Sequence, residues 1–142
     1  MYETEFLTAG LTIIGGIIIF IIGESINQFM IKPVVSLKEE IGRVAYCLVY
    51  YADIYANPNI KNDTLIREAS KELRARASEL SAKSNAVSKI VLRLICLPKE
   101  EDMRRASSNL LFLSNSLFTG EPKENVDRRK RIEELLEIKA LK

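Results

Sequence analysis

Six residues between positions 39 and 57 carry side chains that can bind ligands or move protons. They recur at spacings of four, three, four, three and four residues, which places them along one side of a helix: Glu39, Arg43, Tyr46, Tyr50, Asp53 and Asn57. Such a strip could bind a polar ligand or a partner helix, because Tyr and Arg are enriched at binding hot spots. The alternative is an ordinary polar face with an ion pair between Glu39 and Arg43. The spacing does not require Glu39 or Asp53 to act as a general acid or base.

The chain lacks the residue types on which most catalytic and metal sites depend. It contains no His, and its two cysteines, Cys47 and Cys96, form no CxxC pair. Both cysteines lie in apolar segments, so we expect free, buried thiols in a reducing cytosol. The sequence therefore predicts no metal, no cofactor and no enzymatic activity.

Two further polar clusters stand out. We expect Ser107, Ser108, Ser114 and Asn115 on the side of their helix away from its apolar stripe, where they would serve helix packing or a subunit contact. The run RRKR places four cations together, which are Arg128, Arg129, Lys130 and Arg131. These cations could contact anionic headgroups or a partner, or they could be a solvated helix start offset by following glutamates.

A nucleic-acid partner is not expected. After Gly23 the chain carries all 21 of its basic residues, but it also carries all of its 19 acidic residues except Glu3 and Glu5. This part of the chain is therefore not strongly basic, as a nucleic-acid-binding surface would require.

A long uncharged segment runs from Phe6 to Gly23. Its 18 residues would form about 27 Å of helix, close to the thickness of the hydrocarbon core of a bilayer. No Lys or Arg precedes the segment and no A-x-A site follows it, which disfavours a cleaved signal. A buried helix of a soluble protein is rarely so uniform, so a membrane anchor is favoured over a core helix.

Basic residues predict how this span is oriented. All 21 Lys and Arg follow it, so we expect residues 1–5 outside and the remainder in the cytoplasm of a cell whose plasma membrane it crosses once. Small residues line one face of the span: Ala9, Thr12, Gly16 and Gly23. This face could pack against another span, although such residues are also common in spanning helices.

The rest of the sequence predicts helices. The spanning helix should extend to about residue 31, with a bend or restart at Pro33 and a capping box formed by Ser36 and Glu39. Helices are then expected over about 37–55, from position 63 or 64, from position 100 to Gly120, and in a charged amphipathic segment over 121–142. The apolar segment 87–97 predicts a buried helix or a strand, and its helical neighbours favour a helix.

The apolar positions of these segments recur at helical spacing and predict inner faces. In chain order they are Leu37, Ile41, Val44, Leu48, Tyr51 and Tyr55; Leu65, Ala69, Leu73, Ala77 and Leu80; Met103, Ala106, Leu110, Leu113 and Leu117; and Ile132, Leu135, Leu136 and Leu141. The fold class is therefore all-α, with one transmembrane helix and a small antiparallel bundle over residues 33–120.

The segments KPVVSLKEEIGRVAYCLVYYADIYANP, ELRARASEL and ASSNLLFLSNSLF resemble a family of small uncharacterised prokaryotic single-pass proteins with a cytoplasmic helical domain. The resemblance implies topology only. The function expected from the whole sequence is a membrane-anchored, non-enzymatic interaction or scaffold protein that self-associates or binds a membrane protein. The alternatives are a small-ligand sensor or accessory subunit using the strip from Glu39 to Asp53, and, less favoured, a pore.

Overall fold

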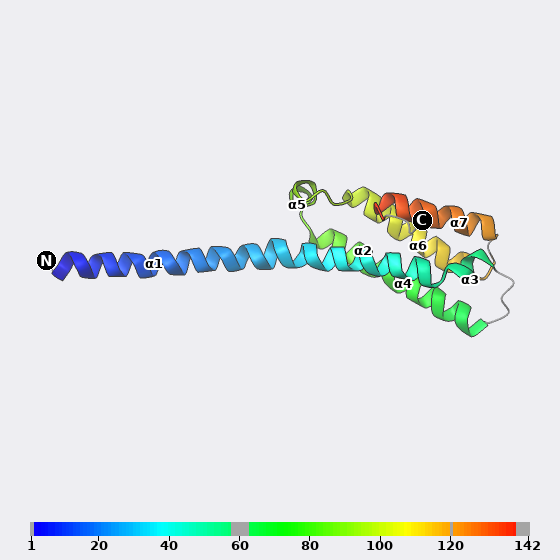
Figure 1. Cartoon of the computed structure of the whole chain (residues 1–142), viewed down its shortest axis with the longest axis horizontal. Coiled ribbons are helices and arrows are strands. Elements are labelled where there is room, and N and C mark those ends of the chain that lie inside the picture. The colour runs from blue at the N-terminus through cyan, green and yellow to red at the C-terminus, as the bar shows by residue number, and fades with distance from the viewer. Residues whose placement is uncertain (1, 58–62, 120, 139–142) are drawn as a thin grey trace.

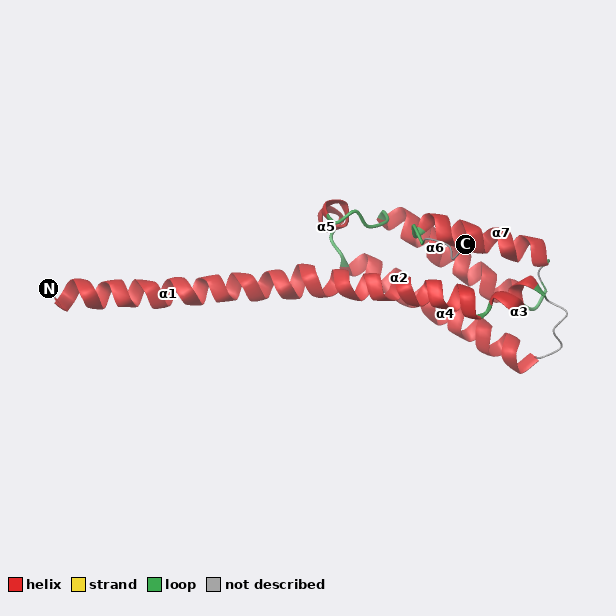
Figure 2. Ribbon diagram, in the orientation of Figure 1, coloured by secondary structure: helices red, strands yellow, loops and turns green. Residues whose placement is uncertain are grey.

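The regular structure of the chain is helical throughout residues 2–57, 63–119 and 121–138, which the computed structural model describes (Figures 1 and 2). The prediction of an all-α chain is confirmed. In order, the elements are α1 (Tyr2–Ile26), the π-helical turn η1 (Asn27–Ile31), α2 (Lys32–Tyr50), α3 (Ala52–Ala56), α4 (Asp63–Ala86), α5 (Lys89–Leu94), α6 (Glu100–Ser116) and α7 (Pro122–Leu135). We call the packed part, residues 32–138, the helical domain.

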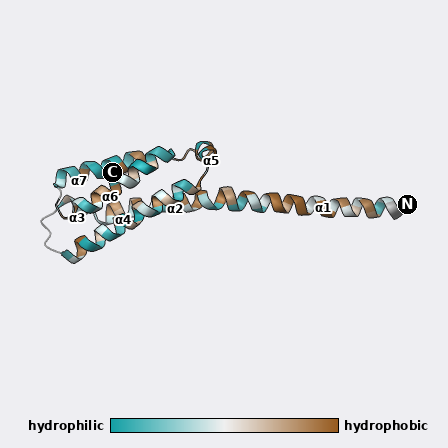
Figure 3. Ribbon diagram, turned by 180° about the vertical axis from the view of Figure 1, so that it is seen from behind, coloured by the Kyte–Doolittle hydropathy of each residue, from teal (hydrophilic) through white to brown (hydrophobic). Residues whose placement is uncertain are grey.

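The first helix is long and apolar enough to cross a membrane. It continues through η1 into α2, so that a single helical rod of 47 residues runs from Thr4 to Tyr50. None of its most apolar 18-residue window is buried, and Figure 3 shows the hydrophobic stretch projecting away from the helical domain. Among the residues that the structure describes, these side chains pack into no core.

The rod passes Pro33 without a break, so the prediction of a bend or restart there is wrong. Proline lacks an N–H and its ring clashes with the carbonyl one turn earlier in a regular α-helix. The wider π turn Asn27–Ile31 directly precedes Pro33, and the N–H of Lys32 donates to the carbonyl of Asn27 five residues back. The predicted capping box is also wrong, because Ser36 lies inside α2 rather than at a helix start.

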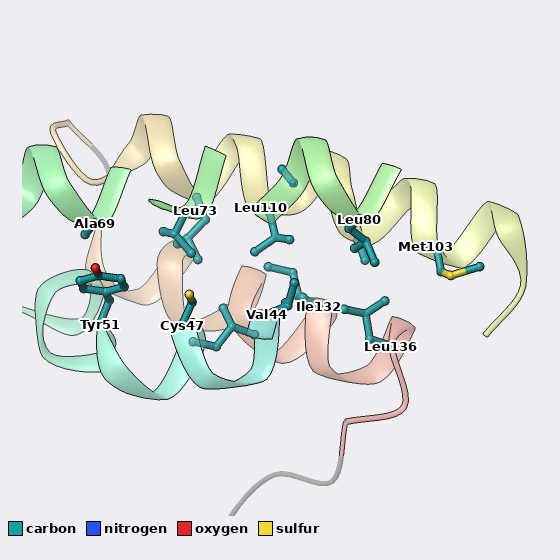
Figure 4. Packing of buried hydrophobic residues seen from close by; sticks show 14 of the residues in the cluster. Val44, Cys47, Tyr51, Ala69, Leu73, Leu80, Met103, Leu110, Ile132 and Leu136 are labelled. Carbon is teal, nitrogen blue, oxygen red and sulfur yellow. The ribbon is translucent and has the colours of Figure 1, made fainter. Parts of the chain in front are cut away.

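The helical domain is held by an apolar core shared between α2, α4, α6 and α7. Helix α4 lies against both α2 and α6, while α7 lies against α6 and α3. Figure 4 shows side chains from these helices meeting between the ribbons. Burial of each large aliphatic side chain stabilises the fold by about 1.5–3 kcal/mol. Fully buried members include Leu37, Val44, Leu48, Leu73, Leu80, Met103, Leu110, Leu113 and Ile132.

Most of the predicted inner faces are confirmed, with local corrections. In α4 the buried residue of the first turn is Ile66, and Leu65 is 39% exposed. Helix α2 ends at Tyr50 rather than near Tyr55, because the backbone turns at Tyr51. That turn brings Tyr55 back against α2, where its hydroxyl donates to the carbonyl of Leu48. Leu141 lies outside the described residues, as do Pro58, Asn59 and Gly120.

Helix α5 confirms that the segment 87–97 forms a helix and not a strand. The expectation of a wholly buried helix is wrong, because only the six residues Lys89–Leu94 are helical and they are not all buried. Val91 and Leu92 face the core, whereas Ile90 and Leu94 are each 71% exposed.

The serine-rich side of α6 also differs from the expectation. Ser107 and Ser114 are buried rather than turned away from the core. The Ser107 hydroxyl donates to the carbonyl of Ala77 in α4 at 2.6 Å, so this serine serves helix packing. Asn115 is exposed and accepts a hydrogen bond from Arg74 at 2.7 Å.

Candidate functional site

The predicted polar strip lies on the surface of the helical domain. Its first four members are on α2, where Tyr46 and Tyr50 are 64% and 63% exposed and their rings stack with centroids 5.5 Å apart. Tyr50 also meets the ring of Tyr51 edge-on at 4.9 Å. The stacked pair therefore rests against the buried Tyr51, while both of its rings remain mostly exposed.

The strip is not continuous along one helix. Because the backbone turns at Tyr51, Asp53 lies on α3 and Asn57 at its end, and the helical spacing on which the strip was predicted stops at Tyr50. Both residues are exposed, as is Glu39. The structure brings Tyr46 and Tyr50 together, but it does not gather all six residues around a common point.

Two residues that the strip omitted belong to the same surface. Val49 is 48% exposed, and Gly42 is exposed with nothing within 4 Å of where a Cβ would lie. With Tyr46 and Tyr50 they form what we call the outer face of α2. Their offsets from Gly42, which are four, seven and eight residues, keep them within one side of the helix. This spacing was readable in the sequence, but Val49 is apolar and was therefore not counted with a polar strip.

A buried ion network lies next to this outer face and was missed by the sequence analysis. The side chain of Glu40 is fully buried, and its two oxygens lie 2.8 Å from Nη1 of Arg76 and 3.1 Å from Nζ of Lys83. Arg43 stands at the rim, 3.7 Å from Glu40. Since α4 supplies both close cations, Glu40 ties α4 to the rod that continues into α1.

Outer carboxylates complete the network. Arg76 Nε lies 3.0 Å from Glu72, and Lys83 Nζ lies 3.2 Å from Glu79, each one turn away on α4. The hydrogen bond to Glu40 raises the pKa of Lys83. Burial alone would lower the pKa of Arg76, but the neighbouring carboxylates outweigh it and raise that pKa. Both cations therefore remain charged, which a buried carboxylate needs.

The two cysteines have opposite environments. Cys47 is buried, as predicted, and its thiol lies 4.0 Å from a carboxylate oxygen of Glu72. Burial, together with this carboxylate, raises the pKa of Cys47 to about 11. Cys96 is exposed, so the prediction of two buried thiols is wrong for this residue. It follows α5, outside the core, with a φ of 50°.

No family model, curated protein or solved structure matches the chain. The resemblance to small prokaryotic single-pass proteins therefore stays a prediction. In the described part of the chain, no three His, Cys, Asp or Glu side chains are grouped so that they could hold a metal ion.

The small residues of the predicted span have open space around them. At Gly16 and Gly23 a Cβ would meet nothing within 4 Å. The hydroxyl of Thr12 donates to the carbonyl of Thr8 at 2.9 Å, one turn back in the same helix. This face, which also includes Ala9, is therefore open to lipid or to another helix.

The cations of the run RRKR are mostly paired within α7. Arg128 bonds Glu124 at 2.6 Å, Arg129 bonds Glu133 at 2.8 Å, and Arg131 lies 3.4 Å from Glu134. The guanidinium of Arg128 also lies 5.0 Å from the ring centroid of Phe112. Lys130 is exposed. Pairing of this kind leaves little net charge for headgroups, so contact of these four residues with a membrane or a partner stays a prediction.

Proposed function

We propose that this chain is a single-span, membrane-anchored interaction protein that has no enzymatic activity and self-associates. The N-terminus would lie outside the plasma membrane and the helical domain, as an antiparallel bundle, would lie in the cytoplasm. The observation that carries the proposal is the continuous rod, whose first part is apolar and unburied and whose last part presents the exposed outer face of α2. The excess of Lys and Arg after the span supports the orientation.

The outer face suits a protein partner better than a small ligand. Pockets for small ligands are concave and bury most of the ligand. Instead, three side chains project from the exposed side of α2, as anchor residues do at helix–helix contacts: Tyr46, Val49 and Tyr50. A second copy supplies the same face, so that the rods of two chains could lie along one another from the span to Tyr50.

Native mass spectrometry of the full-length protein, extracted in mild detergent, tests the proposal. We expect a closed homo-oligomer, and we expect Val49→Lys to shift the population toward the monomer because it places a charge within the contact. The matched control is Leu111→Lys, which adds the same charge at an exposed position of α6, where Leu111 is 39% exposed. A monomer in the unmodified protein, or equal effects of the two variants, would contradict self-association through this face.

A further inference from the structure

Helix α5 presents apolar side chains where the helical domain meets α1. Ile90 and Leu94, one turn apart, are each 71% exposed, and Ile95 is 38% exposed. The opposite side of the helix is fixed to the core by Val91 and Leu92, which are 8% and 3% exposed. Helix α5 is therefore held in place while its outer side offers a patch of large aliphatic groups, which in soluble proteins usually marks a contact site.

The position and direction of α5 indicate what this patch could contact. Figure 1 shows α5 at the end of the helical domain that α1 approaches, and it is seen nearly end-on while α1 and α2 run across the picture. Helix α5 thus lies crosswise to the rod. If α1 crosses a membrane, a helix in this direction runs along the membrane surface, as interfacial amphipathic helices do.

In the described part of the chain, three unpaired cations line a cavity next to α5, on the side of Leu92 and Arg93. The cavity has a volume of about 520 Å³, and its lining includes Arg93, Lys99 and Arg104. Within the described residues, no carboxylate lies at ion-pair distance from these three side chains. The two acidic residues of the lining are already engaged, because Glu100 lies 3.2 Å from Lys89 and Glu101 lies 2.6 Å from Arg105. The cavity therefore has a surplus of positive charge that can bind phosphate groups.

We propose that α5 and this cavity form a binding site for the anionic phospholipids of the adjoining membrane leaflet. Ile90 and Leu94 enter the boundary between headgroups and acyl chains, and Arg93, Lys99 and Arg104 bind lipid phosphates. Apolar insertion and electrostatic attraction to anionic lipids act together in interfacial helices. The inference rests on the proposed membrane anchoring of α1, and it adds a second contact that seats the helical domain on the membrane.

The test uses the full-length protein in lipid nanodiscs, with an environment-sensitive fluorophore on a single reactive cysteine. In a Cys96→Ser background, Leu94→Cys places the label on α5, Phe20→Cys places it in the span, and Phe118→Cys places it in the turn that follows α6. One set of discs contains phosphatidylcholine alone, and a second set contains phosphatidylglycerol as well. Quenching of each label by a spin-labelled lipid is measured in both sets.

We expect the α5 label to be quenched at least half as strongly as the span label in discs with phosphatidylglycerol. In phosphatidylcholine alone, its quenching should fall toward that of the Phe118 position. Arg93→Gln with Arg104→Gln should remove the difference between the two lipids. The matched control is Arg67→Gln with Lys71→Gln, which removes the same charge from exposed positions in the first turns of α4 and should leave the difference intact.

The other outcomes distinguish failure of the lipid site from failure of the membrane anchor. If the span label is quenched and the α5 label is not, the lipid site is overturned while the membrane anchor stands. If the α5 label is quenched equally in both lipids, or if the two charge variants act alike, the anionic specificity is overturned. If the span label itself is not quenched, the proposed membrane anchoring fails, and the lipid site fails with it.

Discussion

At the scale of single residues, Glu40 and its neighbour Glu39 show how one position along a helix changes the role of a carboxylate. Glu39 is exposed, whereas Glu40 is fully buried between two cations of α4. Loss of one partner from a buried ion network leaves charges that the protein interior solvates poorly. The consequences of this burial can be measured with a matched pair of substitutions.

Glu40→Gln should lower the free energy of unfolding by about 3 kcal/mol, because it leaves Arg76 and Lys83 without their shared carboxylate. The measurement is urea denaturation in mild detergent, followed by helical circular dichroism. Glu39→Gln is the control and should change the free energy by about 0.5 kcal/mol or less, since its side chain is exposed. Equal losses in the two variants would show that the Glu40 network does not hold α2 to α4.

The thiols should differ sharply in reactivity. At pH 8 we expect a thiol reagent to modify Cys96 rapidly and Cys47 only on unfolding, because burial raises the pKa of Cys47 to about 11 and blocks access. The Cys96→Ser variant, whose only thiol is Cys47, should therefore react with the reagent only in denaturant. Fast modification of Cys47 in the folded protein would contradict its burial.

The same pKa gives a stability change at high pH. The ordinary value is 9.0 and the folded value is about 11, so folding favours the protonated thiol. This contribution is fully present below pH 9 and is lost as the pH rises through 11. A Cys47→Ala variant should accordingly show a smaller loss of stability over this interval than the unmodified protein.

At the scale of elements, two helices end in the same backbone conformation. After α5 and after α7, a residue that is not glycine adopts a left-handed conformation, Cys96 with a φ of 50° and Glu137 with a φ of 53°. In each case a following N–H reaches back to the helix, from Leu97 to Leu92 and from Ile138 to Glu133. Glycine normally occupies this position because it has no Cβ to clash.

Glu137→Gly should therefore stabilise the folded chain, by about 0.5–1 kcal/mol, because it relieves the left-handed conformation after α7. Glu137→Ala is the control, since it removes the same charge but keeps the Cβ, and it should give no such gain. Thermal unfolding of both variants checks the difference. A lower melting temperature for the glycine variant would show that the helix end is not shaped by this turn.

At the scale of the whole molecule, the decisive feature is that the apolar helix and α2 form one rod. The π turn before Pro33 keeps the rod continuous, and the Glu40 network attaches α4 to it. The orientation of the outer face of α2 is thus fixed relative to α1. A rotation or tilt of α1 would be passed to the helical domain without a flexible joint.

Spin labels at Phe20→Cys and Tyr46→Cys, in a Cys96→Ser background, should report a single narrow distance near 39 Å between backbones, from a rise of about 1.5 Å per residue over the intervening helix. Double electron–electron resonance of magnetically diluted protein in nanodiscs measures this distance. Insertion of two glycines after Ile31 is the comparison and should broaden the distribution. A broad distribution in the uninserted protein would contradict a rigid rod.

The helices and most of their buried faces follow from hydrophobic periodicity in the sequence. Apolar residues at helical spacing, such as Leu73, Ala77 and Leu80, are removed from water together when one face of their helix is buried. The uncharged segment that begins at Phe6 has more apolar side chains than one face of a small domain could cover. Because these properties are local and periodic, they do not depend on what the helices pack against.

By contrast, the burial and pairing of polar residues follow from how the helices pack against one another. Glu40 is buried because α4 places Arg76 and Lys83 beside it. Ile90 and Leu94 are exposed because α5 lies at the edge of the core. The passage through Pro33 depends on a π turn that adds a residue without a sequence signal. These features arise from contacts between segments far apart in the chain, and such contacts leave no periodic pattern in any one of them.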